Sequence, residues 1–509
     1  MSTAATGEHP GVIGKQFGPT DKDYDRAHLQ YATSTHRVDH GMNPGLVVQP
    51  RSKDDIKKVI AYAKANKKAI AIRTGGHQYS GASSTGPHNI QLDLKNTFES
   101  SEDLSFVSHS LDKFNAFLRK HKVFVPHGQC STVHLGGHVQ TGGYGQLGRS
   151  FGLLGDHKKI TRSSDPDLFF AWLGGSPGNL GVLTHFSIQV HRDDDHRGSI
   201  GLYATHLYNK DKLRKLVGHL AEMSDNENFP RNYDVCISVV SSSLKLFSSL
   251  ELLPVGGLES LDEKVKEEHP EIFDDDGNLV KIWPRLIVVY AQYVPFGPND
   301  KPDMAFLEQF KKGSIPLRRL TTQVKAPMSQ LTKLWIFPHA REFEYPYIKR
   351  TYLTNSKTLR VEKIMPSGNG QWLSAQLQCF GGENSMFTRN ANNGTAYSWR
   401  DSTLCMTIDN FHKPEKKAEA EAWQATNDAE AIGPNGIFSK QDRRVLWGSY
   451  GSFDLDSVWN TYYEDRPKYE RLMQTRTLAD PEGIFTPNTF CVKRARDSVR
   501  KNPPGHRKI

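Results

Sequence analysis

Two glycine-rich segments constrain this chain more than any other part of its sequence. The first, Arg73–Gly81, reads RTGGHQYSG, and the second, Gly128–Gly145, reads GQCSTVHLGGHVQTGGYG. Glycine adopts backbone angles that other residues avoid, so successive N–H groups in such loops can converge on an anion such as a pyrophosphate. Each segment also places one chemically competent side chain, His77 or Cys130, among its glycines. We therefore expect the fold to bring both segments to one ligand.

The chemistry of these two side chains suggests which ligand this is. An imidazole and a thiol readily form a stable bond to the ring system of a flavin, so we interpret His77 and Cys130 as a double covalent tether for FAD. A third glycine segment, Gly174–Gly181, would complete a groove for an extended dinucleotide. The NAD fingerprint Gly-x-Gly-x-x-Gly does not occur between a strand and a helix near an acidic residue. Taken singly, His77 could be a loop histidine and Cys130 an inert buried thiol.

Hydrophobic periodicity predicts an alternation of strands and helices in the first part of the chain. A helix is expected to begin after Ser52, because Ile56, Val59, Ile60 and Ala63 recur at helical spacing. A second amphipathic helix is expected at 111–118, between a strand from 104 and a strand that ends at Pro126. Further strands are expected at 46–50, 69–72 and 89–94. The glycine loops would then follow strand ends, where ligands usually bind.

Between about 195 and 425 the pattern changes to longer strands, which predicts an antiparallel sheet with helices on one face. The expected strands are 233–240, 287–293 and 404–408, and the expected helices lie around 210–223 and 302–312. Along the run 373–378, alternation puts Gln376 and Gln378 on one face, opposite Ala375 and Leu377. The charged segment 256–283 is expected to be a surface excursion, and a helix near 465–478 belongs to a closing segment.

Composition limits the partners and the compartment. The 65 basic and 56 acidic residues give a net charge of +9, but no nucleic-acid-binding motif accompanies the basic tail, 493–508. The chain has no apolar stretch of about 18 residues, so we expect no membrane span. The start of the chain lacks a secretory signal, and five scattered cysteines argue against a disulfide framework. We expect an intracellular monomer without a metal, or a secreted protein if a leader was removed.

The motifs together resemble the berberine-bridge-enzyme-like branch of the vanillyl-alcohol-oxidase superfamily. The matching stretches are Pro50–Gly81, Gly128–Asp156, Asp165–Leu183, Tyr469-Glu-Arg-Leu and Asp480-Pro-x-x-Ile-Phe. The resemblance implies an α+β fold. A two-subdomain FAD-binding domain of the vanillyl-alcohol-oxidase type would comprise residues 1–195 and 426–509. A substrate domain, 196–425, would carry an antiparallel sheet covered by helices.

In that branch the histidine of Arg-x-Gly-Gly-His bonds the flavin 8α-methyl group, and the cysteine of Gly-x-Cys-x-x-Val bonds carbon 6. His77 and Cys130 occupy those positions, and such tethers raise the reduction potential of the flavin. Cys130 needs thiolate character, for which His134 and His138 are candidate supports. The other expected FAD contacts are Arg73, Thr74, Gly75, Gly76, Gln78, Gly81, Gly136, Gly137, His138, Gly142, Tyr144, Gly145, Asn179, Gly181, Val182 and Asn488.

The sequence departs from the family where the catalytic base is expected. The family's Tyr-x-Asn-Tyr motif aligns with Trp447-Gly-Ser449-Tyr450, so the usual first tyrosine is a tryptophan here. Trp447 suggests either a planar substrate stacked on it or a chemistry that departs from simple alcohol oxidation. The candidate catalytic residues are Tyr450, Tyr144, Trp447, Gln376 and Gln378. Further polar groups, each more simply explained as structural or solvated, are Glu383, Asp409 and His412.

The resemblance implies an FAD-dependent oxidase that acts on a small-molecule alcohol. Hydride would pass from a carbon of a carbohydrate or of a secondary-metabolite or aromatic alcohol to flavin N5, and dioxygen would reoxidise the flavin to give hydrogen peroxide. The alternatives are a biosynthetic flavin dehydrogenase or oxidative cyclase, and a flavoprotein that has lost its catalytic base. Nucleic-acid binding by the basic tail has little support.

Overall fold

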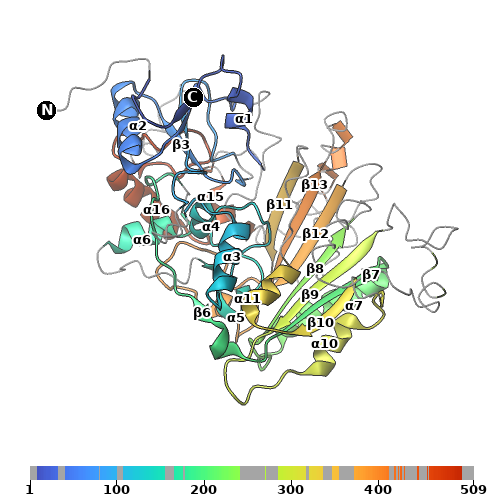
Figure 1. Ribbon diagram of the computed structural model, residues 1–509. Coiled ribbons are helices and arrows are strands. Elements are labelled where there is room, and N and C mark those ends of the chain that lie inside the picture. Colours follow the sequence, from blue (N-terminus) through green and yellow to red (C-terminus); the bar gives the residue numbers. More distant parts are fainter. Residues whose placement is uncertain are drawn as a thin grey trace.

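The computed structural model describes most of the chain in continuous stretches. They are residues 9–31, 41–78, 81–99, 107–154, 165–175, 178–240, 285–316, 320–335, 347–354, 372–411 and 458–495, together with a few residues between them. The strand expected from 104 begins outside these stretches, and nearly all of the excursion expected at 256–283 lies outside them as well. Figure 1 shows a unit of short strands and helices beside a sheet of long strands.

The first unit is built on a four-stranded sheet of order β1-β2-β4-β3. Strands β2, β4 and β3 run parallel to one another, and β1 pairs antiparallel with β2. The strands are β1 Lys15–Phe17, β2 Leu46–Gln49, β3 Ile70–Arg73 and β4 Ile90–Asp93. The strands expected from the sequence at 46–50, 69–72 and 89–94 are thereby confirmed. Strand β3 leads directly into the first glycine segment.

Helix α2 (Lys53–Ala65) covers this sheet where the sequence predicted it. The Ser52 side chain accepts a hydrogen bond from the Asp55 N–H, which caps the helix N-terminus. Ile56, Val59 and Ala63 point into a core that also contains Ile70 and Leu92 of the strands. Burying one such aliphatic side chain stabilises the fold by about 1.5–3 kcal/mol, so the apolar stripe of α2 holds β3 in place.

The second glycine segment follows helix α3 (Leu111–Lys120), which buries Leu111, Phe114 and Leu118 as its pattern predicted. The Ser110 side chain caps this helix by accepting from the Lys113 N–H. Short elements then enclose the segment. They are β5 Val123–Phe124, α4 Leu135–Gln140, α5 Gly148–Phe151, α6 Pro166–Trp172 and β6 His191–Arg192, which pairs with β5, and near the N-terminus lies α1 Tyr24–His28.

The second unit is an eight-stranded sheet of order β10-β7-β9-β8-β12-β13-β11-β14. Every neighbouring pair is antiparallel. The strands are β7 Ile200–Leu207, β8 Tyr233–Val240, β9 Leu286–Tyr293, β10 Thr321–Lys325, β11 Tyr347–Thr354, β12 Trp372–Cys379, β13 Leu404–Phe411 and β14 Arg444–Val445. The helices are α7 Lys210–Asp225, α10 Met304–Lys311, α11 Met328–Leu331 and α13 Met386–Arg389, with 3-10 turns at Asp193–His196 and Thr332–Leu334. The expected α+β fold with a helix-covered antiparallel sheet is confirmed.

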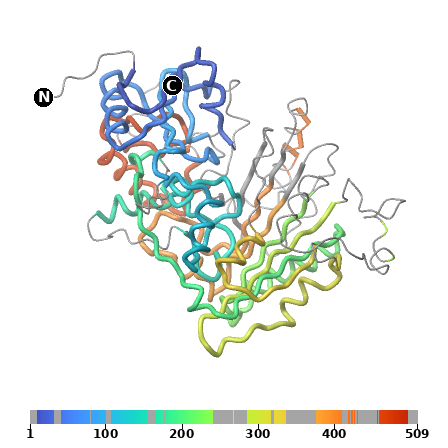
Figure 2. Tube along the Cα trace, in the orientation of Figure 1, coloured from blue at the N-terminus to red at the C-terminus, as the bar shows by residue number. Residues whose placement is uncertain are grey.

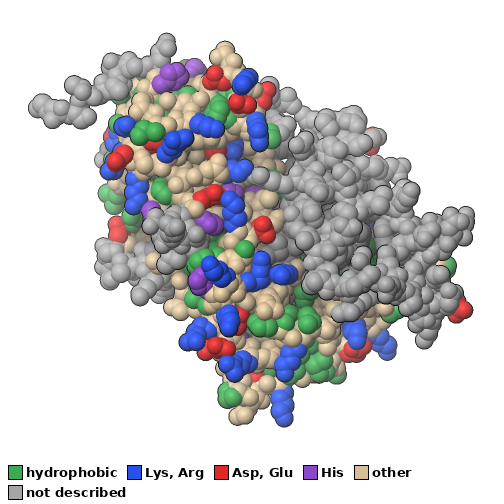
Figure 3. Space-filling model, viewed as in Figure 1, with side chains coloured by type: hydrophobic (Ala, Val, Ile, Leu, Met, Phe, Trp, Pro, Cys, Tyr) green, Lys and Arg blue, Asp and Glu red, His purple; other side chains and the backbone are tan. Residues whose placement is uncertain are grey.

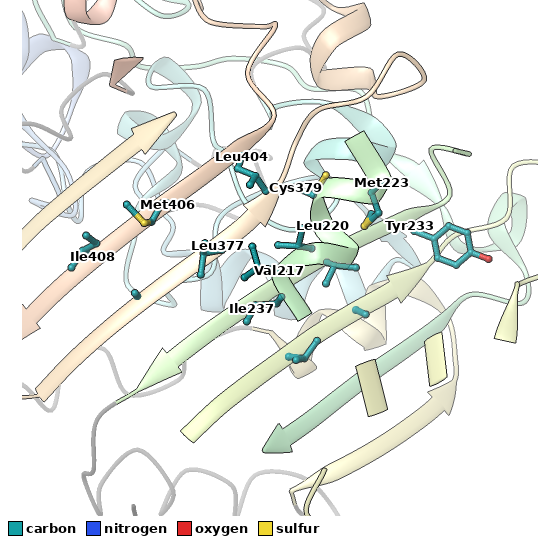
Figure 4. Close-up of a cluster of buried hydrophobic side chains, with 14 of the residues drawn as sticks. Val217, Leu220, Met223, Tyr233, Ile237, Leu377, Cys379, Leu404, Met406 and Ile408 are labelled. Atoms are coloured by element: carbon teal, nitrogen blue, oxygen red, sulfur yellow. The ribbon is translucent and has the colours of Figure 1, made fainter. Parts of the chain in front are cut away.

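The two faces of this sheet differ in chemistry. Helices α7 and α10 pack on one face, where Leu220 of α7 meets Ile237 and Leu377 in the buried cluster of Figure 4. Alternation along β12 follows the prediction, because Ala375 and Leu377 are buried in this cluster while Gln376 and Gln378 face the other side. On β12 the second face therefore presents polar groups toward the glycine segments, whereas over β7, β8 and β9 it carries a second buried apolar cluster.

The C-terminal segment returns to the first unit, as Figure 2 shows by the proximity of red and blue tubes. Helices α15 (Trp459–Tyr462) and α16 (Arg466–Ala479) precede Ile484, whose carbonyl accepts a 2.7 Å hydrogen bond from the Ile70 N–H. Strand β14 joins the large sheet although it falls beyond residue 425. The unit boundaries expected at 195 and 425 stay predictions. Within the described part of the chain, no helix is long and apolar enough to cross a membrane.

Candidate functional site

A cavity lies between the glycine segments and the polar side chains of β12 and β13. Its empty space is about 1220 Å³, part of which is open to solvent. The lining residues that the sequence predicted are Thr74, Gly75, Gly76, His77, Gln78, Cys130, Gly136, Gly137, His138, Tyr144, Gly145, Gly181, Gln376 and Gln378. The fold therefore brings His77 and Cys130 to the same cavity, with the two glutamines of β12 in its opposite wall.

His77 is held in the first glycine segment by two contacts. Its Nε2 lies 3.1 Å from the Thr132 hydroxyl oxygen. The ring of Tyr31 stacks on the imidazole with a centroid distance of 3.9 Å and an interplanar angle of 23°. Gly76, one residue earlier, has a φ of +70°, which favours glycine. The imidazole is thus positioned by residues from three separate parts of the chain.

The loop around Cys130 needs glycine because its backbone packs closely against neighbouring groups. A Cβ atom at Gly128 would lie 2.8 Å from Cε1 of His138, and one at Gly145 would lie 2.3 Å from the His127 carbonyl oxygen. Any side chain at either position would displace a neighbour. The glycines therefore allow the Cys130 loop to pack closely against the His138 ring and the 142–145 turn.

His138 is neutral, and this corrects the proposed support for a thiolate. Its Nε2 accepts a 2.8 Å hydrogen bond from the Gly128 N–H, so a neutral ring carries its proton on Nδ1. Burial, with a smaller contribution from the nearby His127, lowers the pKa of His138 to about 3. Burial also lowers the pKa of His127 to about 4. His138 consequently supplies no positive charge to Cys130, and His134, which lines the same cavity, stays the other candidate.

The wall formed by the large sheet offers neutral hydrogen-bonding groups. Gln376 and Gln378 of β12 and Thr407 of β13 line the cavity. Beside Gln378, on the neighbouring strand β8, burial raises the pKa of the Cys236 thiol to about 11, and Gln129 and Gln378 bond this thiol. The thiol therefore stays protonated at neutral pH and cannot take a proton from a substrate.

Several predicted FAD contacts support the cavity from outside its lining. The Arg73 guanidinium donates to the Ala27 and Leu29 carbonyls at 3.0 and 2.6 Å and pairs with the buried Asp93 carboxylate at 3.2 Å. The Asn488 amide donates to the Gly81 and Ser84 carbonyls. Residues in this group are Arg73, Gly81, Gly142, Asn179, Val182 and Asn488. Their direct contact with a cofactor stays a prediction.

Asn179 belongs to a second supporting network, at the end of the third glycine segment. Its amide nitrogen donates to the Phe485 carbonyl at 3.0 Å and contacts the Cys491 sulfur at 2.9 Å. The buried Arg476 donates to the Asn179 and Phe485 carbonyls and pairs with Asp480 at 3.3 Å. This network fastens the third glycine segment to the closing segment of the chain.

The structure leaves most candidate bases untested. Trp447, Ser449, Tyr450 and His412 lie outside the described residues. Glu383 is exposed beyond the end of β12 and does not line the cavity. Asp409 lies in β13, where its Cα pairs with that of Ser374. Tyr144 is the tyrosine that the described lining contains.

Sequence reasoning missed several residues that the fold places here. Thr407 could have been found, because Cys405 and Thr407 alternate with the apolar Leu404 and Met406 along β13. Gln129, Thr132, Ser83 and Gln140 also line the cavity or hold its residues, and they lie inside or beside the glycine segments. Tyr31 has no local signal, since only the tertiary fold brings it to His77.

The lining suits a flavin dinucleotide. Glycines at 75, 136 and 137 line the cavity and let its wall pack closely, since a Cβ at Gly136 would lie 2.7 Å from Val107 Cγ1. An imidazole and a thiol reach the same space from different loops. The FAD binding domain family matches residues 44–166, which contain both loops. Fold and site together define an FAD-binding protein.

Comparison with known proteins shows which proteins this chain is similar to. Berberine bridge enzyme-like 19 of Arabidopsis thaliana is 30% identical over 200 residues, which is 35% of this chain and 35% of that relative. The matched stretch thus spans about a third of that relative's length. A variant of berberine bridge enzyme described as a reticuline dehydrogenase has a similar fold, with a TM-score of 0.69 at 16% identity over 96% of this chain and 98% of that chain. The chain is thus similar to berberine-bridge-enzyme-like proteins, over about a third of its length in sequence and over nearly all of it in fold.

A second solved structure shares the fold. Glucooligosaccharide oxidase from Acremonium strictum has a TM-score of 0.65 at 16% identity, over 94% of this chain and 97% of that chain. Its description gives that protein a 6-S-cysteinyl, 8α-N1-histidyl FAD. This likeness shows the fold, and the flavin linkage described there belongs to that protein.

Proposed function

We propose that this protein is an FAD-dependent oxidase that carries its cofactor on both His77 and Cys130. The observation that carries this proposal is the meeting of both side chains at one glycine-lined cavity. The glucooligosaccharide oxidase with the same fold has a histidyl and cysteinyl FAD, which supports the double tether here. Bound FAD would accept a hydride from the substrate and pass the electrons to dioxygen, giving hydrogen peroxide.

The substrate proposed here is a small neutral alcohol, either a carbohydrate or a secondary-metabolite alcohol. The cavity wall has three side chains that can each donate and accept hydrogen bonds, namely Gln376, Gln378 and Thr407. They can therefore bind a substrate hydroxyl group whether it donates or accepts. These side chains would bind and orient the carbon that is oxidised. Tyr144 is a candidate to take the hydroxyl proton, although a phenol needs its pKa lowered from about 10 to act as a base. Tyr450 remains the other proposed phenol.

The tether is tested by denaturing the protein in acid and asking whether the flavin stays with the precipitate. We expect a yellow precipitate from the unaltered protein and from His77→Ala and Cys130→Ala singly. Only the double variant should release all flavin. His121→Ala is the control, because His121 caps α3 away from the cavity lining. A colourless precipitate from the unaltered protein would end the double-tether proposal.

The oxidase activity is tested by a screen of sugars, phenols and polyketide alcohols that measures peroxide. We expect one class to bleach the flavin without air and to yield one peroxide per alcohol oxidised in air. Fast bleaching with slow reoxidation in air would instead assign a dehydrogenase. No bleaching by any alcohol would favour a flavoprotein without a catalytic base.

A further inference from the structure

A short N-terminal segment lies directly against the loop that carries His77. This segment, residues 24–31, begins with helix α1 (Tyr24–His28) and ends at Tyr31. A Cβ atom at Gly76 would lie 3.1 Å from Gln30 Oε1 and 3.2 Å from the Tyr31 backbone nitrogen. The glycine before His77 is therefore required for the segment to approach, and this approach brings the Tyr31 ring onto the imidazole at 3.9 Å.

Buried hydrogen bonds hold the segment in place. Arg73, at the start of the His77 loop, donates to the Ala27 and Leu29 carbonyls at 3.0 and 2.6 Å. Gln30 donates to the Gln91 side chain at 2.9 Å. Gln30 also accepts from the Ser83 hydroxyl at 2.8 Å. Because these partners belong to strands β3 and β4 and to the loop after His77, Tyr31 is fixed relative to the sheet. It is not a freely moving terminal residue.

The opposite support comes from the second glycine segment. The Thr132 hydroxyl lies 3.1 Å from His77 Nε2, and a Cβ at Gly75 would lie 3.0 Å from the Thr132 carbonyl oxygen. Thr132 is two residues from Cys130, so one loop carries both the second tether and the group that orients the first. The imidazole is held on one face by an aromatic ring and at one nitrogen by a hydroxyl.

We infer that Tyr31 and Thr132 are positioning residues that hold the His77 imidazole in the ring orientation from which its bond to the flavin forms. This inference rests on the proposed attachment of FAD through His77. In that attachment a C–N bond replaces one C–H bond of the flavin 8α-methyl group. The methyl proton and the imidazole N–H proton would both leave to solvent, and the electron pair of the broken C–H bond would remain on the flavin until dioxygen takes it with two protons to give hydrogen peroxide. Such a bond needs near-ideal orientation, because small displacements of a reacting group cost large factors in rate.

The test follows the rate of attachment in a Cys130→Ala background, where His77 supplies the sole bond. Protein from riboflavin-limited cultures is incubated with FAD in air, and the flavin that stays with acid-precipitated protein is measured over time. Tyr31→Phe keeps the stacked ring and should attach at the parent rate. Tyr31→Leu loses the stack and should attach roughly two- to tenfold more slowly, the factor that an aromatic pair is worth. Leu29→Ala, in the same segment and 43% exposed, is the matched control.

Thr132 provides the second arm and covers the case in which Tyr31→Leu does not fold. Thr132→Ser keeps the hydroxyl and should attach like the parent, whereas Thr132→Val should be slower by roughly two- to tenfold, the worth of one hydrogen bond. Equal rates within both pairs would overturn the inference and leave the tether itself intact. If the Cys130→Ala parent binds FAD and never retains it in acid, the proposed His77 tether fails instead.

Discussion

Replacing His138 by glutamine should remove a large part of this protein's sensitivity to acid. His138 is half-buried in the cavity wall and accepts a hydrogen bond from the Gly128 N–H, which a glutamine oxygen can also accept. Burial lowers the pKa of this histidine from 6.5 to about 3 in the folded protein. At a pH between these two pKa values, His138 is protonated in the unfolded chain and neutral in the folded chain. The free energy of unfolding is therefore unaffected by His138 above about pH 6.5 and decreases as the pH falls below it.

The size of the effect follows from that difference in pKa. Each pH unit below 6.5 costs about 1.4 kcal/mol per group, so protonation of the unfolded chain at pH 5 costs about 2 kcal/mol through His138. His127, whose pKa is lowered to about 4 by burial, adds a similar cost. Asp234 acts in the opposite direction, because burial raises the pKa of its carboxyl to about 6. The protonated Asp234 carboxyl therefore stabilises the folded protein at low pH, and this stabilisation is lost as the pH rises through about 6. At pH 5 it offsets about 1.4 kcal/mol of the stability that is lost through the two histidines.

The measurement is the free energy of unfolding in urea at pH 7.5 and at pH 5, compared between the unaltered protein and each variant. The unaltered protein should lose stability on acidification, and His138→Gln should lose about 2 kcal/mol less than it does. His88→Gln, at an exposed position, is the control and should keep the full loss. If His138→Gln shows the same acid loss as the unaltered protein, the ring is not a neutral acceptor in the folded protein and the argument fails.

Two further predictions concern the supports of the cavity. Arg476→Met should destabilise the protein by about 3–5 kcal/mol, because it leaves the buried Asp480 carboxylate without its ion-pair partner. Thermal unfolding measures this loss. The control is Arg471→Met, because the Arg471 side chain is half-exposed. A double variant that also carries Asp480→Asn should recover part of the loss. Gln376→Leu should raise KM for the alcohol about fivefold, because the loss of one hydrogen bond costs about 1 kcal/mol, and kcat should change less. An unchanged KM would show that Gln376 does not bind the substrate.

Patterns within short stretches of the sequence correctly predicted several helices and strands. The helix after Ser52 and the strand at 233–240 formed as expected, because apolar spacing and a capping residue act within a few residues of sequence. The same locality explains why Gln376 and Gln378 were assigned to the right face of β12. The candidate base near Trp447 stays a prediction, since that stretch lies outside the described residues.

The predictions that failed or fell short depended on distances between remote segments. His138 was expected as a possible support for a thiolate, but its burial against Gly128 makes it neutral. The contact of Arg73 with the cofactor stays a prediction, and the structure adds that its guanidinium donates to carbonyls of the N-terminal segment and pairs with Asp93. A sequence motif shows which residue types are present, but it does not show which groups form hydrogen bonds with them.

The sequence by itself indicated an FAD-binding protein, because its glycine segments, His77 and Cys130 occur in the order seen in the family that the chain resembles. Strand and helix periods likewise follow from residues close together in the chain. Only the tertiary structure decided the protonation of His138, the polar wall opposite the tethers, and the place of Tyr31 against His77. Those properties arise from desolvation and from contacts between residues that are not neighbours in the sequence, and such contacts exist only once the chain has folded.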